Sequence, residues 1–305
     1  MKHLPHDSPP QLTRRSLLLG AATLIPILNL PRERFQTIAG APSPEKQFAS
    51  IETRLGGRLG VAALDTGNGH RIAHRASERF PMCSTFKFLL VAAILSRVDA
   101  HHEKLDRVIH YTQSDLLDYA PITKAHAQEG DMTISALCAA AVEYGDNTAA
   151  NLLLGAAGGP AAVTRYVRSL GDPVTRLDRY EPSANTCIAG DPRDTTSPSA
   201  MLHDMQTLLL DKRSLSEDSR SQLEAWLVAN TTGAARLRAG LPPSWRIGDR
   251  TGTGDNGSAN DIAICWPPNR PPILVTAYFT GSRASDADRS AALAEVGRIV
   301  AAAFS

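Results

Sequence analysis

The chain has almost no excess of charge of either sign, which excludes a first class of functions. Its 305 residues include 32 lysines and arginines against 31 aspartates and glutamates, and neither sign forms a long block. A nucleic-acid-binding protein needs a basic patch to neutralise phosphates. We therefore expect no nucleic-acid partner and look for a small-molecule substrate.

Metal-binding patterns are missing too. The chain has four cysteines, Cys83, Cys138, Cys187 and Cys265. None has the CxxC or Cys/His spacing that chelates zinc, so we expect no metal and no cofactor. An oxidising compartment leaves room for one disulfide, but the spacing selects no pair, and buried free thiols are the expectation.

The N-terminal apolar run is too short to span a membrane. It extends over about residues 16–30 and contains Pro26, whereas a spanning helix needs ~20 residues. The run follows the pair Arg14-Arg15, the pattern of a twin-arginine export signal, and small residues at 39–41 offer a cleavage site. We predict a signal peptide over residues 1–41 and a periplasmic protein with no stable membrane anchor. The alternative is an uncleaved helix packed on the domain.

Hydrophobic residues make up 43% of the chain, enough for a full core, and their spacing changes along it. Helical spacing is found near both ends and throughout the middle, at residues 44–55, 86–98, 134–142, 148–154, 201–210 and 284–304. Strand patterns occur only near the two ends, at residues 59–65, 71–75, 245–251, 259–266 and 273–279.

This distribution predicts an α/β (α+β) domain over residues 42–305. Both ends of the chain would form one antiparallel sheet flanked by helices, from residues 42–76 and 235–305. Residues 77–234 would form a mostly helical lobe, with the active site in the cleft between the lobes. Residues 171–198 contain four prolines and two glycines and read as a long irregular loop, which in a compact domain is usually functional.

The first chemical motif is Ser-x-x-Lys at residues 84–87, where the helical run begins. Residues three apart share a helix face, so the Lys87 amine can sit beside the Ser84 hydroxyl and accept its proton. The N–H groups at the start of the helix lie where an oxyanion would form.

Three further motifs follow in the chain. Residues 144–147 read Tyr-Gly-Asp-Asn, and residues 250–253 read Arg-Thr-Gly-Thr. Taken alone, the first is explained by a helix N-cap at Asp146 or Asn147, and the second by a strand that ends in a turn. In the long loop, Glu181 is either a solvated carboxylate or a base that holds a water with Asn185, on a loop closed by an Arg179–Asp194 ion pair.

From about residue 44 to the C-terminus, these motifs in this order resemble the class A serine β-lactamases, whose signature boxes are S-x-x-K, S-D-N and K-T-G. The stretches at residues 181–186, 190–196, 230–233 and 257–261 also resemble that family. The resemblance implies a monomer that hydrolyses the β-lactam amide of penicillins and some cephalosporins and so confers antibiotic resistance.

The resemblance also implies a role for each matching residue. Ser84 would be acylated, with either Lys87 or a water on Glu181 taking its proton, and Glu181 with Asn185 would activate the deacylating water. The backbone N–H groups of Ser84 and Thr253 would form the oxyanion hole. The substrate would contact Tyr119, Asn147, Arg236, Arg250, Thr251, Gly252 and Thr253. A packing role for Tyr119, and Arg238 in place of Arg236, stay open.

Two boxes depart from the family pattern. Arg250 replaces lysine, which keeps the charge and can bind a carboxylate through two hydrogen bonds. Gly145 replaces the serine thought to relay a proton to the leaving nitrogen. We expect slower acylation and lower sensitivity to inhibitors that cross-link through that serine, with a water filling the space beside Gly145.

A further difference concerns Gly254. Some carbapenem-hydrolysing relatives have a cysteine at this position that bridges to the cysteine before the nucleophile. Glycine leaves Cys83 without that partner, so carbapenem hydrolysis is less expected.

Two other functions share parts of this pattern. A D-alanyl-D-alanine peptidase has the same nucleophile and lysine but no need of a deacylating base such as Glu181. A poorly active β-lactam-binding protein would explain Gly145, although a sensor of that kind usually carries a membrane span and a signalling domain.

Arg250 leads to a substrate prediction, because carbenicillin-hydrolysing relatives share this arginine. We expect hydrolysis of carboxypenicillins as well as benzylpenicillin, since the guanidinium can bind a carboxylate through two hydrogen bonds. Steady-state kinetics with both substrates check this. A kcat/KM for carbenicillin below about one hundredth of that for benzylpenicillin, a loss of about 2.7 kcal/mol in transition-state binding, would count against it.

Overall fold

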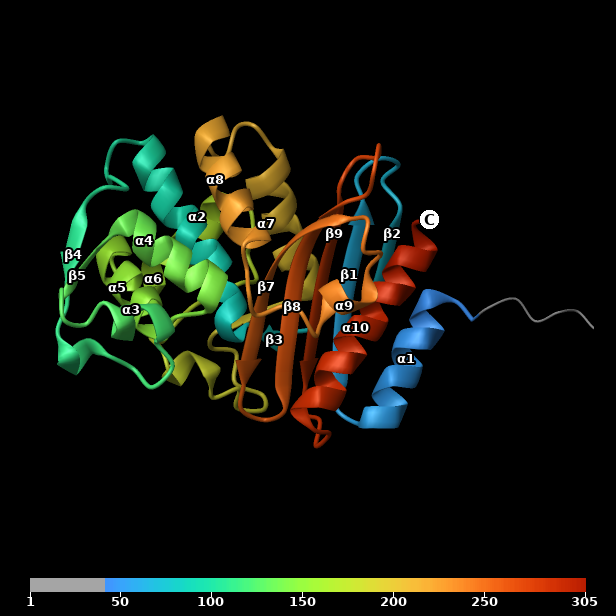
Figure 1. Ribbon diagram of the computed structural model, residues 1–305. Helices are drawn as coiled ribbons and strands as arrows, with labels where there is room; N and C mark the ends of the chain where they lie inside the picture. The colour runs from blue at the N-terminus through green and yellow to red at the C-terminus, as the bar shows by residue number, and fades with distance from the viewer. Residues whose placement is uncertain (1–41) are drawn as a thin grey trace, which may run out of the picture. The chain divides into compact units, whose positions relative to one another are not determined.

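The computed structural model describes residues 42–305, and the expected signal peptide at residues 1–41 lies outside them. In the described part, five strands form one antiparallel sheet in the order β2-β1-β9-β8-β7 (Figure 1). β1 (Arg58–Asp65) pairs along its whole length with β9 (Ile273–Thr280), so both ends of the domain meet in one sheet. The other strands are β2 (Arg71–His74), β7 (Arg246–Gly254) and β8 (Ser258–Trp266). The predicted fold class is confirmed.

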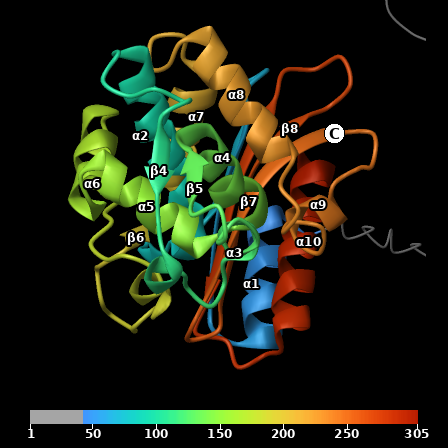
Figure 2. The same cartoon turned by 60° about the vertical axis from the view of Figure 1, so that its left-hand side comes forward.

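Helices cover both faces of this sheet (Figures 1 and 2). One face packs on α1 (Pro44–Leu55), α9 (Leu237–Gly240) and α10 (Asp286–Ala303), and the other on α7 (Pro198–Leu210) and α8 (Glu217–Val228). Each face of the sheet contributes to its own hydrophobic core, and successive strand residues alternate between them. Val61 belongs to the first core, beside α1, α9 and α10, and Ala62 belongs to the second core, beside α7 and α8. With both faces covered, β1, β8 and β9 are buried nearly throughout, and β7 is buried at most positions although Asp249 and Arg250 lie in it.

The second core continues into the helical part of the chain, which surrounds the buried helix α2. Its helices are α2 (Phe86–Asp99), α3 (Pro121–Ala125), α4 (Ile134–Ala139), α5 (Asn147–Ala157) and α6 (Pro160–Ser169). Short strands pair as β3 (Phe80–Pro81) with β6 (Thr195–Thr196), and β4 (Val108–His110) with β5 (Asp131–Thr133). No helix within residues 42–305 is long and apolar enough to cross a membrane.

The elements differ from the expected ones in two respects. The helix expected over residues 134–142 is present, but its hydrogen-bond pattern changes: α4 ends at Ala139 and continues as a π-helical turn (Ala140–Tyr144). In addition, four helices and four short strands were not predicted: α3, α6, α8, α9, β3, β4, β5 and β6.

The loop at residues 171–198 is irregular as predicted, with only a short 3₁₀ turn (Ser183–Asn185) and β6 inside it. Asp194 fixes it. The Asp194 carboxylate accepts hydrogen bonds from the backbone N–H groups of Asp178 and Arg179 at 2.7 and 3.0 Å. Arg179 Nε donates to the same carboxylate at 2.5 Å, which is the expected ion pair. The pair closes the segment that contains Glu181.

Replacing Asp194 by asparagine should destabilise the fold, because it removes the charge opposite Arg179. The Asp194 side chain is 2% exposed and that of Arg179 18% exposed. Since one charge would stay without its partner in a mostly buried place, we expect the free energy of unfolding to fall by about 2–4 kcal/mol. Urea unfolding measures this, with Asp211→Asn in the exposed Asp211–Arg213 pair as the control. Equal effects of the two substitutions would contradict the anchoring role.

Candidate active site

Ser84 stands in a 3₁₀ turn (Cys83–Thr85) that leads into α2. Lys87 Nζ donates a hydrogen bond of 3.0 Å to Ser84 Oγ, as the three-residue spacing predicted. Strand β7 lies directly against this turn: a Cβ on Gly252 would be 2.7 Å from the Met82 carbonyl oxygen and 3.2 Å from Ser84 N. Only glycine allows this approach, so Gly252 brings the strand beside the backbone of Ser84.

Lys87 contacts polar groups from several parts of the site. Its Nζ also donates to Gly145 O at 2.7 Å and to Asn147 Oδ1 at 2.6 Å, and it lies 3.1 Å from Glu181 Oε1. The side chain is fully buried. Burial lowers the pKa of Lys87 to about 8, although the Glu181 carboxylate acts in the opposite direction. The ammonium therefore predominates at neutral pH, and the neutral amine forms at mildly basic pH.

Glu181 is buried within the site and is not a solvated loop carboxylate. Ser84 Oγ donates to its Oε1 at 3.4 Å, and Asn185 Nδ2 donates to its Oε2 at 2.5 Å. Asn151 holds the backbone of Glu181 through two hydrogen bonds of 2.9 Å. Sequence reasoning missed Asn151, whose signal was its place one helical turn after Asn147.

Tyr119 and Asn147 are brought together by backbone contacts. Asp146 caps α5, because its Oδ1 accepts a hydrogen bond from Ala149 N at 2.8 Å, so the N-cap interpretation holds for this residue. Asn147 N donates to Tyr119 O at 3.0 Å. Tyr119 is 55% exposed, and its hydroxyl donates to Tyr144 O at 3.1 Å. Tyr119 is thus held at a wall and is not a core tyrosine.

Arg236 and Arg238 were both candidates for the arginine that reaches the cleft, and their contacts differ. Arg236 donates to Gly252 O at 2.8 Å and to Thr253 Oγ1 at 2.6 Å, beside the motif on β7. Arg238 instead pairs with the buried Asp249 at 2.5 Å. Arg236 is the one of the two that lies in the cleft.

We expected a water in the space beside Gly145, but a protein side chain occupies that space. A Cβ on Gly145 would lie 2.8 Å from Arg250 Nη2, so the guanidinium occupies that space. Burial lowers the pKa of Arg250 to about 10, which leaves it charged at neutral pH. Arg250 Nη1 donates to Thr232 Oγ1 at 3.1 Å, and that oxygen is 2.6 Å from Thr251 Oγ1. Thr232 was not predicted, although it lies in a stretch that carried the resemblance.

A cavity of about 340 Å³ gathers these side chains. Its walls are Ser84, Tyr119, Tyr144, Gly145, Asn147, Asn185, Thr232, Arg236, Arg250, Thr251, Gly252 and Thr253. Every residue expected to contact the substrate lies on it, and Lys87 and Glu181 are buried behind Ser84. The arrangement can hold a small anionic ligand against an activated hydroxyl.

Known proteins are similar to this chain in sequence and in fold. The model of the beta-lactamase enzyme family matches residues 43–304. Beta-lactamase Toho-1 of Escherichia coli is 45% identical over 96% of this chain and 99% of its own length. Beta-lactamase AST-1 of Nocardia asteroides is 46% identical over 93% and 91%. The solved structure of an ancestral (GNCA) class A beta-lactamase has a TM-score of 0.84 and 59% identity, covering 86% of this chain and 100% of that one. The chain therefore belongs to the class A serine β-lactamases, the enzymes that hydrolyse β-lactam antibiotics.

Proposed function

We propose that the enzyme hydrolyses penicillins and some cephalosporins through an acyl-enzyme on Ser84, which a water activated by Glu181 then cleaves. One observation carries this proposal: Ser84 Oγ lies 3.0 Å from Lys87 Nζ and 3.4 Å from Glu181 Oε1, at the wall of the cavity. A hydroxyl with a carboxylate and a lysine side chain in reach is a usable nucleophile.

In the acylation step, Ser84 Oγ attacks the lactam carbonyl and the ring C–N bond breaks. The backbone N–H groups of Ser84 and Thr253 would hold the oxyanion. With a pKa of about 8, about one Lys87 amine in ten is neutral at pH 7. Glu181 therefore serves as the main base at neutral pH, and Lys87 contributes more as a base when the pH rises and more of its amine is neutral.

In the deacylation step, Glu181 takes a proton from water, whose oxygen attacks the ester carbonyl and releases Ser84 Oγ. Asn185 binds one oxygen of the Glu181 carboxylate and can orient the same water. Asn151 and the Arg179–Asp194 pair keep the loop in place for this step. The peptidase alternative has no use for such a base.

Substrate binding follows from the charges and amides on the cavity wall. Arg250, Thr251 and Arg236 would bind the substrate carboxylate, because two guanidinium groups and a hydroxyl converge there. Asn147 would receive the side-chain amide, and Tyr119 would form the wall of the cleft. The Arg250 guanidinium also lies against Gly145, so it would be a charged donor on the side of the missing serine.

Export to the periplasm is part of the proposal. It is supported by the paired arginines and the short apolar run in residues 1–41, and by an activity that protects the cell wall only when the enzyme meets the antibiotic outside the cytoplasm.

Replacing Glu181 by glutamine should stop turnover at the acyl-enzyme. The amide keeps the side-chain size but cannot take a proton from water, so a chromogenic cephalosporin should give a burst of one equivalent and then stop. Mass spectrometry should find the acyl group on Ser84. Glu217→Gln, at the exposed start of α8, should behave as the native enzyme does.

The native enzyme should turn over continuously in the same assay; a stoichiometric burst would instead favour a peptidase, and no reaction a binding protein.

The rate of this burst in Glu181→Gln also tests whether Lys87 can act as a base. Without Glu181, whose charge raises the pKa of Lys87, this pKa should fall below about 8. The burst rate should rise with pH through that value, because only the neutral amine accepts a proton. A rate that is constant between about pH 6 and 9 would exclude Lys87 as a base.

Restoring serine at position 145 requires a second change. Gly145 has a φ of +74°, and Arg250 Nη2 fills its side-chain space, so Gly145→Ser alone should be strained. Arg250→Lys frees that space, and the positive φ that remains costs about 1–2 kcal/mol of stability. In this background, Gly145→Ser should speed acylation about tenfold or more over Arg250→Lys alone and raise clavulanate sensitivity. Stopped-flow acylation rates that are equal in the double and single variants would disprove this account of Gly145.

A further inference from the structure

Cys83 and Cys187 lie in contact, although they are far apart in the sequence. Their Sγ atoms are 3.4 Å apart, and the side chains are buried. Cys83 directly precedes Ser84, and Cys187 follows Asn185 by two residues on the long loop. Nothing in the proposed chemistry uses either thiol.

The end of strand β7 leaves room for both sulfurs. A Cβ on Gly254 would lie 2.6 Å from Cys187 Sγ and 2.8 Å from Cys83 Sγ. A side chain at this position would therefore displace both thiols. A disulfide bond is about 2.05 Å long, so the two sulfurs must approach by about 1.4 Å, which small rotations of two short side chains can supply.

We propose that Cys83 and Cys187 form a disulfide when the protein is in an oxidising compartment. The bond would tie the loop that carries Glu181 to the residue before Ser84. Cys138 on α4 and Cys265 on β8 are fully buried, and burial raises the pKa of both thiols, which makes them unreactive.

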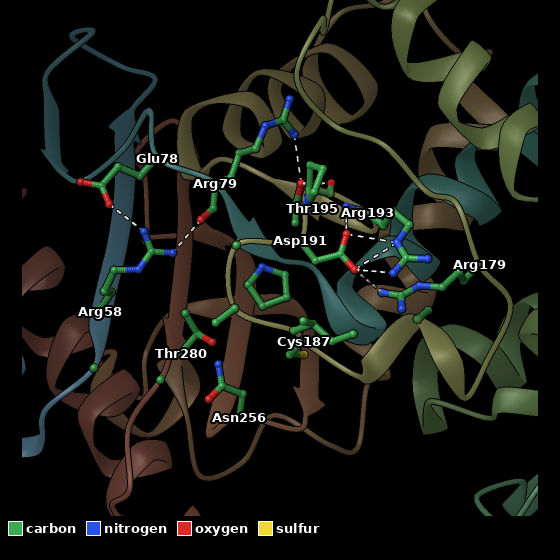
Figure 3. Close-up of a pocket in the computed structure, with 18 residues that line it drawn as sticks. Arg58, Glu78, Arg79, Arg179, Cys187, Asp191, Arg193, Thr195, Asn256 and Thr280 are labelled. Carbon is green, nitrogen blue, oxygen red and sulfur yellow. Dashed lines mark hydrogen bonds and ion pairs between the residues drawn. The ribbon is translucent and has the colours of Figure 1, made fainter.

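A second cavity gives an oxidant access to Cys187, the outer member of this pair. It has a volume of about 600 Å³, and Cys187 is part of its lining (Figure 3). No residue lines both this cavity and the active-site cavity. Its lining contains four arginines, Arg58, Arg79, Arg179 and Arg193, against the two carboxylates of Glu78 and Asp191. Because Arg179 is also paired with Asp194, outside the lining, a net excess of one positive charge remains, and it favours a small anionic disulfide such as oxidised glutathione.

The order of reaction follows from the environments of the two thiols. The hydrogen bond with Cys83 lowers the pKa of Cys187, and the same bond together with burial raises the pKa of Cys83. Cys187 is also the more exposed, at 5% against 1%. The Cys187 thiolate is thus the attacking group.

The exchange balances without any group from the active site. The Cys187 thiolate attacks one sulfur of oxidised glutathione, forms a mixed disulfide and expels one glutathione thiolate. Cys83 then loses its proton and attacks Cys187 Sγ, which expels the second glutathione. The two cysteines lose two electrons and two protons, and one glutathione disulfide becomes two glutathione thiols.

Thiol labelling and peptide mapping test the proposal. The folded native protein is equilibrated with oxidised glutathione, denatured in acid and labelled with N-ethylmaleimide. Two labels are expected, on Cys138 and Cys265, and four after prior reduction. Trypsin without reductant should yield the peptide of residues 80–87 joined to that of residues 180–193, since each is bounded by lysine or arginine. Cys138→Ala, the matched control, should keep this bridge.

Three results would overturn the proposal: four labels on the equilibrated protein, a bridge to Cys138 or Cys265, or a glutathione adduct that persists on Cys187 without the bridge. Thermal unfolding gives an independent readout. Because the bond would close a long loop in the unfolded chain, oxidation should raise the midpoint of the native protein by about 5 °C or more. Cys187→Ser should show no shift, and an equal shift in this variant would also overturn the proposal.

Discussion

The buried amine of Lys87 is the interaction on which the rest of the site depends. A charged group that is removed from water must find partners, and Lys87 finds them on three separate segments of the chain. Ser84 comes from the turn that leads into α2, Gly145 and Asn147 come from the segment where α5 begins, and Glu181 comes from the long loop. The loss of any one of these contacts would leave part of a buried charge unpaired, so the amine fixes the positions of the nucleophile and the base together.

The long loop can place Glu181 in the site only because side chains of Asp194 and Asn151 hold its backbone. It has almost no secondary structure of its own, and its position comes from side-chain contacts to its backbone. Asp194 binds two backbone N–H groups near its start, and Asn151 binds both the N–H and the carbonyl of Glu181. Buried backbone groups that helix or strand would normally satisfy are satisfied here by carboxylate and amide side chains.

The sequence was informative where chemistry and periodicity act locally. The Ser84–Lys87 contact followed from helical spacing, and the sheet followed from apolar strand patterns at both ends. α8 was missed because its first half is polar and only its last turns carry large buried side chains. α6 was missed although it has helix signals, Pro160 at its first position and Val163 and Val167 at helical spacing. The contact of Arg250 with Gly145 joins residues from different elements, as do Arg238 with Asp249 and Cys83 with Cys187. No pattern along the chain reports such pairs.

Three residues of β7 show how one strand shapes the whole cleft. Gly252 has no side chain, so the strand reaches the backbone of Ser84; Gly254 has none, so two sulfurs fit between the strand and the loop. Arg250 has the largest side chain of the three, and it fills the space that Gly145 leaves on the opposite wall. The departures from the family pattern at positions 145 and 250 are therefore one feature, because a side chain at one position takes the volume that the other gives up. For this reason the proton path to the leaving nitrogen must be understood from the pair of residues and not from Gly145 alone.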